Sequence, residues 1–188
     1  MAGILSEAER AHLAEVAQAL AEAARRETLA AFRPEGGIAA QNKLAGGFDP
    51  VTAADRAAEA AMREILARER PEDGIYGEEY GVKSGSSGLT WVLDPIDGTR
   101  GYMSGTPTWG VLIALSEELE DGPGRPLMGL IDQPYIGERF FGGFGAAWSR
   151  GPLGERRLRT RAARPLAEAV LYSTFPEVGT PEEGAAFA

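Results

Sequence analysis

The chain has 188 residues, of which 44% are hydrophobic, and a formal net charge of −9 at pH 7. This is enough apolar sequence for one sizeable domain, or for one domain and part of another. The acidic balance argues against binding to nucleic acids or anionic membranes, because both depend on clustered lysine and arginine.

The absence of cysteine excludes disulfides, thiolate catalysis and cysteine-ligated metals. The single histidine, His12, lies in an expected helix with no acidic motif beside it, which argues against most Ser-His-Asp and imidazole-ligated zinc schemes. Glu7, Glu9 and Arg10 stand where a signal peptide needs an apolar core, and no apolar run is long enough to span a bilayer. We therefore expect a soluble, cytoplasmic protein.

The first expected element is a long amphipathic helix. Ser6 and Glu9 fit a capping box, and apolar residues then recur at helical spacing to about Phe32. Pro34 and the glycine pair that follows it end the helix.

A second helix follows a loop that contains Lys43. Thr52 and Asp55 are spaced as a helix N-cap and its N3 partner, and the apolar spacing continues to Pro71. Asp55 is therefore explained by capping alone, and Lys43 by a solvated loop, unless other residues give them a further role.

The segment Gly74–Gly81 predicts a short strand that runs into a turn with two adjacent acids, Glu78 and Glu79. Adjacent like charges repel unless they point apart or share a cation. The following residues, Lys83 to Gly88, are expected to form an exposed loop.

The most informative stretch is Trp91–Thr99, with the sequence Trp-Val-Leu-Asp-Pro-Ile-Asp-Gly-Thr. An apolar strand ends on Asp94, and Asp97 follows in a turn that proline and glycine make tight and rigid. The Ile96 carbonyl is a third oxygen that a metal could use. The stretch is either an ion site or an ordinary aspartate-rich turn after a strand.

The rest of the chain is expected to form an antiparallel meander and then the start of a new domain. Four strands are predicted at Trp109–Leu115, Leu127–Asp132, Glu138–Gly142 and Gly145–Trp148, with an acidic hairpin loop at Glu117–Arg125 between the first two. A basic exposed strand and linker follow at Arg150–Arg164, and a last strand at Ala169–Ser173.

Three acidic motifs now occur in order: Val-Thr-x-x-Asp at Asp55, Gly-Glu-Glu at Glu78, and the motif from Asp94 to Thr99. Together they closely resemble the inositol monophosphatase family of magnesium-dependent, lithium-sensitive phosphatases. The resemblance extends from the first helix to the strand at Ala169–Ser173.

The resemblance implies an α+β fold, a layered sandwich of the inositol monophosphatase and fructose-1,6-bisphosphatase type. Two helices would pack on a mostly antiparallel sheet in an N-terminal domain at residues 1–163, and residues 164–188 would begin a C-terminal α/β domain.

The resemblance also implies a metal site. Glu78, Asp94 and the Ile96 carbonyl would hold one Mg²⁺, and Asp94 and Asp97 would extend toward a second ion. Two or three ions are expected, with Mn²⁺ as a substitute. Such metals neutralise phosphate oxygens and activate water, so no histidine base is required.

Further roles follow from the same resemblance. Gly98 and Thr99 would present backbone N–H groups to the phosphate. Thr99 and Asp55 would orient and deprotonate the attacking water, with Lys43 and Glu79 in supporting positions.

The segments Asp97–Gly110 and Ile131–Phe140 look most like the bacterial histidinol-phosphate phosphatase branch, which acts in histidine biosynthesis. Inositol-1-monophosphatase and 3'(2'),5'-bisphosphate nucleotidase activity are the alternatives within the family. A metal-binding relative without activity and an acidic Ca²⁺-binding module are the non-enzyme alternatives. A homodimer is the family expectation.

The sequence departs from the family pattern in one respect. The family's second motif, Trp-Asp followed by small residues, supplies a further metal ligand, and it does not occur before Ala188. Either this chain is the N-terminal part of a longer protein, or it is a fragment that cannot hold the second metal in the usual way; we expect the first.

Overall fold

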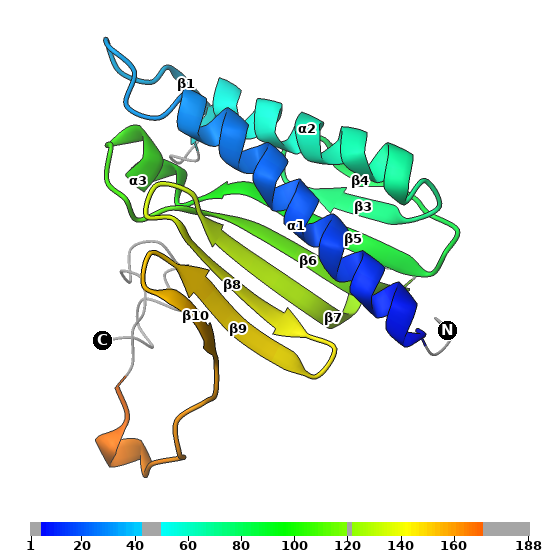
Figure 1. The fold of residues 1–188 in the computed structure, drawn as a ribbon. Coiled ribbons are helices and arrows are strands. Elements are labelled where there is room, and N and C mark those ends of the chain that lie inside the picture. The colour runs from blue at the N-terminus through cyan, green and yellow to red at the C-terminus, as the bar shows by residue number, and fades with distance from the viewer. Residues whose placement is uncertain (1–4, 43–49, 120–121, 171–188) are drawn as a thin grey trace. The chain divides into compact units, whose positions relative to one another are not determined.

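The computed structural model describes residues 5–42, 50–119 and 122–170. Two long helices and an eight-stranded sheet dominate these residues, with a separate two-stranded ribbon (Figure 1). The elements are α1 (Glu7–Ala30), β1 (Ala40–Asn42), β2 (Pro50–Thr52), α2 (Ala53–Glu69), β3 (Gly74–Gly77), β4 (Gly81–Lys83), β5 (Leu89–Asp97), α3 (Thr99–Met103), β6 (Gly110–Leu119), β7 (Gly122–Gln133), β8 (Glu138–Gly143), β9 (Ala146–Gly151), β10 (Gly154–Arg157) and the 3-10 helix η1 (Leu166–Glu168).

Both predicted capping boxes are confirmed. Glu9 N donates to Ser6 Oγ at 3.2 Å, and Ser6 N donates to Glu9 Oε2 at 2.8 Å. Thr52 and Asp55 form the same reciprocal pair at the start of α2. Each box satisfies N–H groups that the first turn of a helix leaves without a partner.

The large sheet has the strand order β10-β9-β8-β7-β6-β5-β3-β4. From β5 to β10 each strand pairs antiparallel with the next, as the predicted meander requires, whereas β3 pairs parallel with β5. A parallel pair needs a crossover connection, so its strands are not joined by a hairpin.

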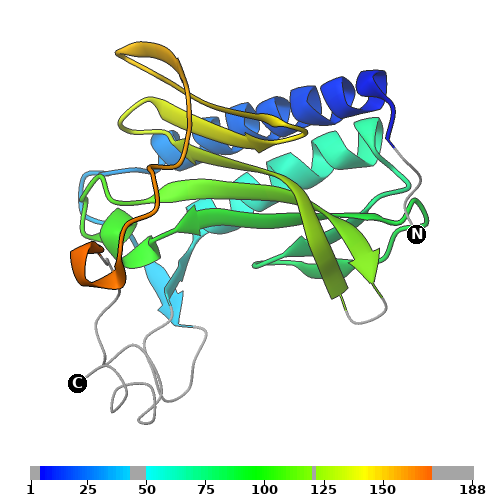
Figure 2. The same ribbon diagram turned by 90° about the horizontal axis from the view of Figure 1, so that it is seen from below.

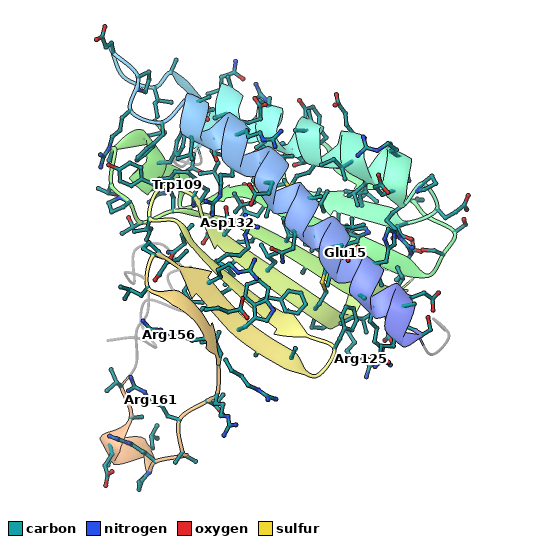
Figure 3. All side chains as sticks on the ribbon, in the orientation of Figure 1. Glu15, Trp109, Arg125, Asp132, Arg156 and Arg161 are labelled. Atoms are coloured by element: carbon teal, nitrogen blue, oxygen red, sulfur yellow. The ribbon has the colours of Figure 1, made fainter. Side chains whose placement is uncertain are left out.

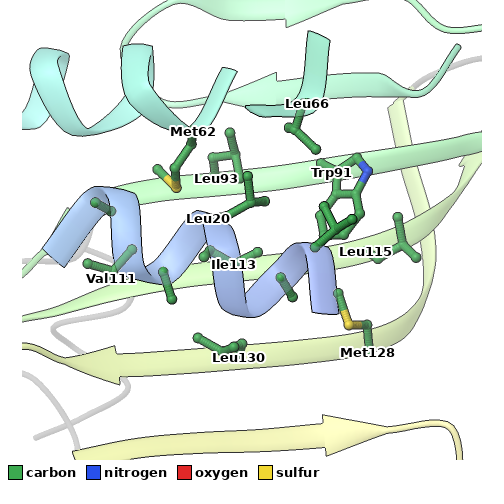
Figure 4. Packing of buried hydrophobic residues seen from close by; sticks show 14 of the residues in the cluster. Leu20, Met62, Leu66, Trp91, Leu93, Val111, Ile113, Leu115, Met128 and Leu130 are labelled. Atoms are coloured by element: carbon green, nitrogen blue, oxygen red, sulfur yellow. The ribbon is translucent and has the colours of Figure 1, made fainter. Parts of the chain in front are cut away.

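The helices α1 and α2 lie side by side on one face of this sheet (Figures 1 and 2). Their apolar stripes meet alternate residues of the strands, because side chains of a strand point to opposite faces in turn. The resulting core contains Leu20, Met62, Leu66, Trp91, Leu93, Val111, Ile113, Leu115, Met128 and Leu130 (Figure 4).

The other face of the sheet carries an apolar pocket of about 590 Å³. Residues that alternate with the core, such as Val92, Leu112 and Phe140, line it, and Asp94 lies among them. This pocket therefore reaches the strand that bears the acidic motif.

The predicted loop at Glu117–Arg125 is wrong over most of its length. The strands β6 and β7 continue through the described part of this segment, and Pro123 and Pro126 are paired opposite Glu118 and Ser116. The register shifts around Ser116 explain this, since irregular pairing accommodates prolines that cannot donate a ladder hydrogen bond.

The loop predicted at Lys83 to Gly88 begins after Lys83 in the structure, because Lys83 is the last residue of β4. Its ammonium donates to the carbonyls of Pro71 and Asp73, at 2.9 Å each. The predicted exposed strand in the basic segment is confirmed as β10, whose residues are all exposed.

The chain divides into two units, Met1–Leu158 and Arg159–Ala188. The described part of the second unit is exposed and contains only η1 as a regular element. Of the strand predicted at Ala169–Ser173, Ala169 and Val170 are not in a strand and the remainder lies outside the described residues. The predicted domain boundary between residues 163 and 164 stays a prediction. None of the helices in the described ranges has the length and apolar character needed to cross a membrane.

Candidate active site

The parallel pairing of β3 with β5 brings two of the acidic motifs together. Gly77, the last residue of β3, is opposite Leu93, and Glu78 N donates to the Leu93 carbonyl at 3.1 Å. Glu78 therefore follows β3 at the position where Asp94 follows Leu93 in β5. The carboxyl ends of parallel strands are a general location for binding sites in α/β sheets.

The predicted tight turn between Asp94 and Asp97 is instead a β-bulge, and β5 continues to Asp97. Asp94 pairs with Leu112 and Asp97 with Gly110, so two residues of β5 lie opposite one residue of β6. The bulge is held locally, since Ile96 N donates to Asp94 Oδ1 at 3.1 Å. Asp97 itself is exposed.

The Ile96 carbonyl, a predicted metal ligand, accepts a hydrogen bond from Thr99 Oγ1 at 3.0 Å. A carbonyl oxygen has two lone pairs, so this bond leaves it able to accept a second partner. Thr99 and Ile96 are thus connected across the glycine at 98.

Negative charge accumulates around Asp94. Burial, followed by the charge of Glu78 and its side-chain contact, raises the pKa of Asp94 to about 8, and Asp97 adds to the rise. Both charged neighbours that shift this pKa are carboxylates. A site of this kind is stabilised by a bound cation, which reverses the local field.

Asp55 lies close enough to this group for Glu78 to affect it. Burial chiefly raises the pKa of Asp55, against the opposing hydrogen bonds from Thr52, and the charge of Glu78 adds to the rise. Its Oδ2 accepts Thr52 N at 2.8 Å and the Thr52 hydroxyl at 2.5 Å. The capping interpretation of Asp55 is confirmed, and its predicted work with Thr99 on a water molecule stays a prediction.

Gly98 leads from β5 into α3 in a left-handed conformation, with φ of +87°. A Cβ atom at this position would lie 2.8 Å from the Thr108 carbonyl oxygen. Only glycine meets both requirements without strain. Phosphate binding by the N–H groups of Gly98 and Thr99 stays a prediction.

An aromatic cluster joins α3 to its neighbours, and Tyr102 of α3 is part of it. The rings of Phe32, Tyr102 and Trp109 lie 4.9 to 5.2 Å apart, and Tyr135 contacts Phe32 at 4.9 Å (Figure 3 labels Trp109). The buried Tyr102 hydroxyl donates to the Thr28 carbonyl of α1 at 2.7 Å. The short helix that follows Gly98 is thereby fixed to α1.

The donor set fits a hard divalent cation. Carboxylates of Glu78, Asp94 and Asp97 and the Ile96 carbonyl are the oxygen ligands that Mg²⁺ and Ca²⁺ prefer. Within the described ranges, however, no three acidic, histidine or cysteine side chains already form a group that could hold a metal ion. The predicted ligands are gathered at the carboxyl ends of β3 and β5, without a complete ligand shell.

Of the supporting residues, Lys43 lies outside the described residues. Glu79 is half-buried, and its N–H donates to Glu59 Oε2 at 2.7 Å. Sequence reasoning missed Glu59, although its spacing of four residues from Asp55 places both carboxylates on one face of α2.

Known proteins of one family are similar in sequence to the part of the chain that contains these site residues. The model of the inositol monophosphatase family matches residues 9–183. The chain is 38% identical to the chloroplastic bifunctional phosphatase IMPL2 of Arabidopsis thaliana, over 97% of this chain and 50% of that protein. It is 37% identical to the histidinol-phosphatase of Streptomyces coelicolor, over 72% of this chain and 50% of that protein.

A solved inositol monophosphatase from Zymomonas mobilis has the same fold, with a TM-score of 0.73, 37% identity, and coverage of 97% of this chain and 65% of that one. The chain spans about half the length of the curated relatives named above. The family match covers nearly all of the chain and includes every acidic motif of the site. The chain therefore belongs to the inositol monophosphatase family.

Proposed function

We propose that the protein is a Mg²⁺-dependent phosphomonoester hydrolase, with histidinol phosphate as its substrate. The observation that carries the proposal is the placement of Glu78 beside Asp94, with the raised pKa of Asp94 as its electrostatic consequence. Family membership and the phosphatase names of the relatives support the reaction class.

Glu78, Asp94, Asp97 and the Ile96 carbonyl would hold the metal, and Mn²⁺ would substitute for Mg²⁺. When bound, two or three such ions would neutralise the phosphate oxygens and lower the pKa of a coordinated water. The carboxylates also keep an anionic substrate away when no cation is present, because like charges repel.

The chain's own residues would bind the phosphate and direct the water. The N–H groups of Gly98 and Thr99 bind phosphate oxygens at the start of α3. Thr99 orients the attacking water, and Asp55 takes its proton. A carboxylate whose pKa is raised by burial is a better proton acceptor near neutral pH than an exposed one. Lys43 and Glu79 support this arrangement.

The reaction balances with water as the only co-substrate. A bond forms between the water oxygen and phosphorus while the bond from phosphorus to the alcohol oxygen breaks. One water proton passes to Asp55, which later returns it to solvent, and the leaving alkoxide takes a proton from solvent to become the free alcohol.

Histidinol phosphate is favoured by the histidinol-phosphatase relative from Streptomyces coelicolor and would place the protein in histidine biosynthesis. Inositol-1-phosphate is the second candidate, because the solved neighbour from Zymomonas mobilis is an inositol monophosphatase. A 3'(2'),5'-bisphosphate nucleotide is the third. We further propose that the protein is cytoplasmic and acts as a homodimer.

The test measures phosphate release by the protein expressed from its complete gene, with Mg²⁺ and each of the three substrates in turn. We expect the highest kcat/KM with histidinol phosphate, and loss of release when the metal is chelated. Higher kcat/KM with inositol-1-phosphate or the nucleotide would replace the proposed substrate. No release from any of them would reject the enzyme.

The variant Asp94→Asn separates the enzyme from a non-catalytic metal-binding relative. We expect it to lose phosphate release while remaining folded. A wild-type protein that binds Mg²⁺ or Ca²⁺ but releases no phosphate would instead indicate the metal-binding relative.

A further inference from the structure

Glu59 is a fully buried carboxylate of α2, with no side-chain exposure. It accepts three hydrogen bonds, from Glu79 N at 2.7 Å, from Tyr80 N at 3.1 Å and from Arg63 Nε at 2.8 Å. Burying a carboxylate is costly unless charge and hydrogen bonds compensate it. Arg63 compensates the charge of Glu59, and two of the three hydrogen bonds that Glu59 accepts come from the turn between β3 and β4, which also contains Glu78.

The two backbone donors are consecutive, and they bond to different oxygens of Glu59. A single side chain thus fixes the orientation of two peptide groups directly after Glu78. Arg63 completes the arrangement, because one of its two terminal guanidinium nitrogens donates to the Gly81 carbonyl at the far end of the same turn.

Gly77 shows how closely Glu59 approaches this turn. A Cβ atom on Gly77 would lie 2.0 Å from Glu59 Oε1 and 2.7 Å from an Arg63 nitrogen. The backbone of β3 is therefore in contact with the carboxylate just before Glu78. Any side chain at position 77 would displace Glu59.

On its other side the turn is held by the bond from Glu78 N to the Leu93 carbonyl, next to Asp94. Glu78 thus lies between two anchors, β5 and the Glu59 carboxylate of α2. Its side chain contacts Asp94. Asp55, on the same face of α2 one turn earlier, couples electrostatically to the same Glu78.

We propose that Glu59 is a positioning residue that sets the Glu78 carboxylate against Asp94 and thereby sets the affinity of the site for divalent cations. This inference rests on the proposed function of Glu78 and Asp94 as metal ligands. Groups that orient metal ligands commonly change metal affinity ~10–100-fold when they are removed.

The test compares Glu59→Gln with Asp73→Asn. An amide keeps only one acceptor oxygen, so whichever way the substituted side chain is turned, one of the two turn N–H groups loses its acceptor. Asp73 is the matched control: it is buried, accepts two bonds from Arg70 and one from Trp91 Nε1 at 2.7 to 3.0 Å, and precedes β3 at the end away from Glu78.

Mn²⁺ dissociation constants are measured by electron paramagnetic resonance on each folded protein, beside its thermal unfolding. We expect Glu59→Gln to raise the dissociation constant about tenfold or more, and Asp73→Asn to lower the melting temperature while leaving the dissociation constant unchanged. Phosphate release by Glu59→Gln should then recover with added metal, because the change is in occupancy. If Glu59→Gln does not fold, Glu59→Asp, which keeps the charge but withdraws it from the turn, serves in its place.

Two results would overturn the inference, and they can be distinguished by whether the proposed function also fails. Equal melting-temperature losses with an unchanged dissociation constant would make Glu59 purely structural and leave the proposed function intact. A wild-type protein that binds no Mn²⁺ and releases no phosphate would defeat both.

Discussion

Glu78 and Asp94 are neighbours because β3 and β5 run parallel with Gly77 opposite Leu93. The two carboxylates follow these paired residues, and the charge of Glu78 adds to burial in raising the pKa of Asp94 to about 8. A cation competes with protons for such a group. This one register connects the fold to the proposed metal chemistry.

The first prediction concerns the pH dependence of stability without metal. Asp94 has a pKa of about 8 when folded and ~3.9 when unfolded, so between these values the folded state holds more protons and stability falls as pH rises. We expect the free energy of unfolding in EDTA to fall by on the order of 2 kcal/mol more in the wild type than in Asp94→Asn between about pH 5.5 and about pH 8. Urea titrations at both pH values measure it.

Added Mg²⁺ should remove most of this loss near pH 8 in the wild type, since a cation stabilises the ionised carboxylate. The variant provides the control for all other titrating groups. Wild type and variant that respond alike to pH would contradict the prediction.

Asp97→Asn should weaken metal binding while leaving the stability of the fold nearly unchanged. Asp97 is exposed, so its substitution should change the free energy of unfolding by no more than ~0.5 kcal/mol. As a proposed ligand it should nevertheless weaken Mg²⁺ activation by at least the ~10–100-fold typical of a lost outer-shell partner. The Mg²⁺ concentration for half-maximal phosphate release, compared with the urea midpoint, tests both. An unchanged Mg²⁺ requirement would remove Asp97 from the site.

Local features of this fold could be predicted from the sequence because their causes are local. The capping pairs at Ser6 and Thr52 lie within one helical turn, and the apolar run before Asp94 identifies its strand. The parallel pairing that places Glu78 beside Asp94 joins residues from separate elements, so only the family resemblance implied their meeting.

Two other features were beyond local patterns. Strands that continue through Pro123 and Pro126 depend on irregular pairing with β6, which composition does not reveal. Glu59 has the helical spacing of the buried face of α2, but that spacing does not reveal its partners, because the N–H groups that it accepts belong to the β3–β4 turn.

Gly98→Ala should cost more than the same change at Gly36. Both glycines have φ near +90° (+87° and +92°), but a Cβ on Gly98 meets the Thr108 carbonyl at 2.8 Å whereas one on Gly36 meets nothing within 4 Å. We expect about 1 kcal/mol of strain at Gly36, and a further ~1–3 kcal/mol at Gly98 from the close approach.

Gly98→Ala should also lower phosphate release, because it displaces Thr99 at the start of α3. Thermal unfolding and phosphate release of the two variants, measured together, test the difference. Equal destabilisation would show that the contact with Thr108 is relieved by small shifts of the backbone.

Asp132→Ala should be among the most destabilising substitutions that leave the metal ligands in place. Asp132 is fully buried and accepts Arg25 Nε at 3.0 Å, an Arg25 terminal nitrogen at 2.6 Å and Arg139 Nε at 2.8 Å, so it joins α1 to β7 and β8. Its removal leaves two guanidinium groups without their buried partner, which typically costs ~3–5 kcal/mol.

Arg125→Ala is the matched control, because Arg125 forms an equally short pair with Glu117, at 2.8 Å, that is open to solvent at the other end of β7 (Figure 3). An exposed pair contributes ~0–1 kcal/mol because water screens it. The free energies of unfolding of the two variants in urea should therefore differ by about 2 kcal/mol or more. A similar small loss in both would mean that water or a side-chain rearrangement compensates Arg25 and Arg139, and that the buried network does not hold α1 on the sheet.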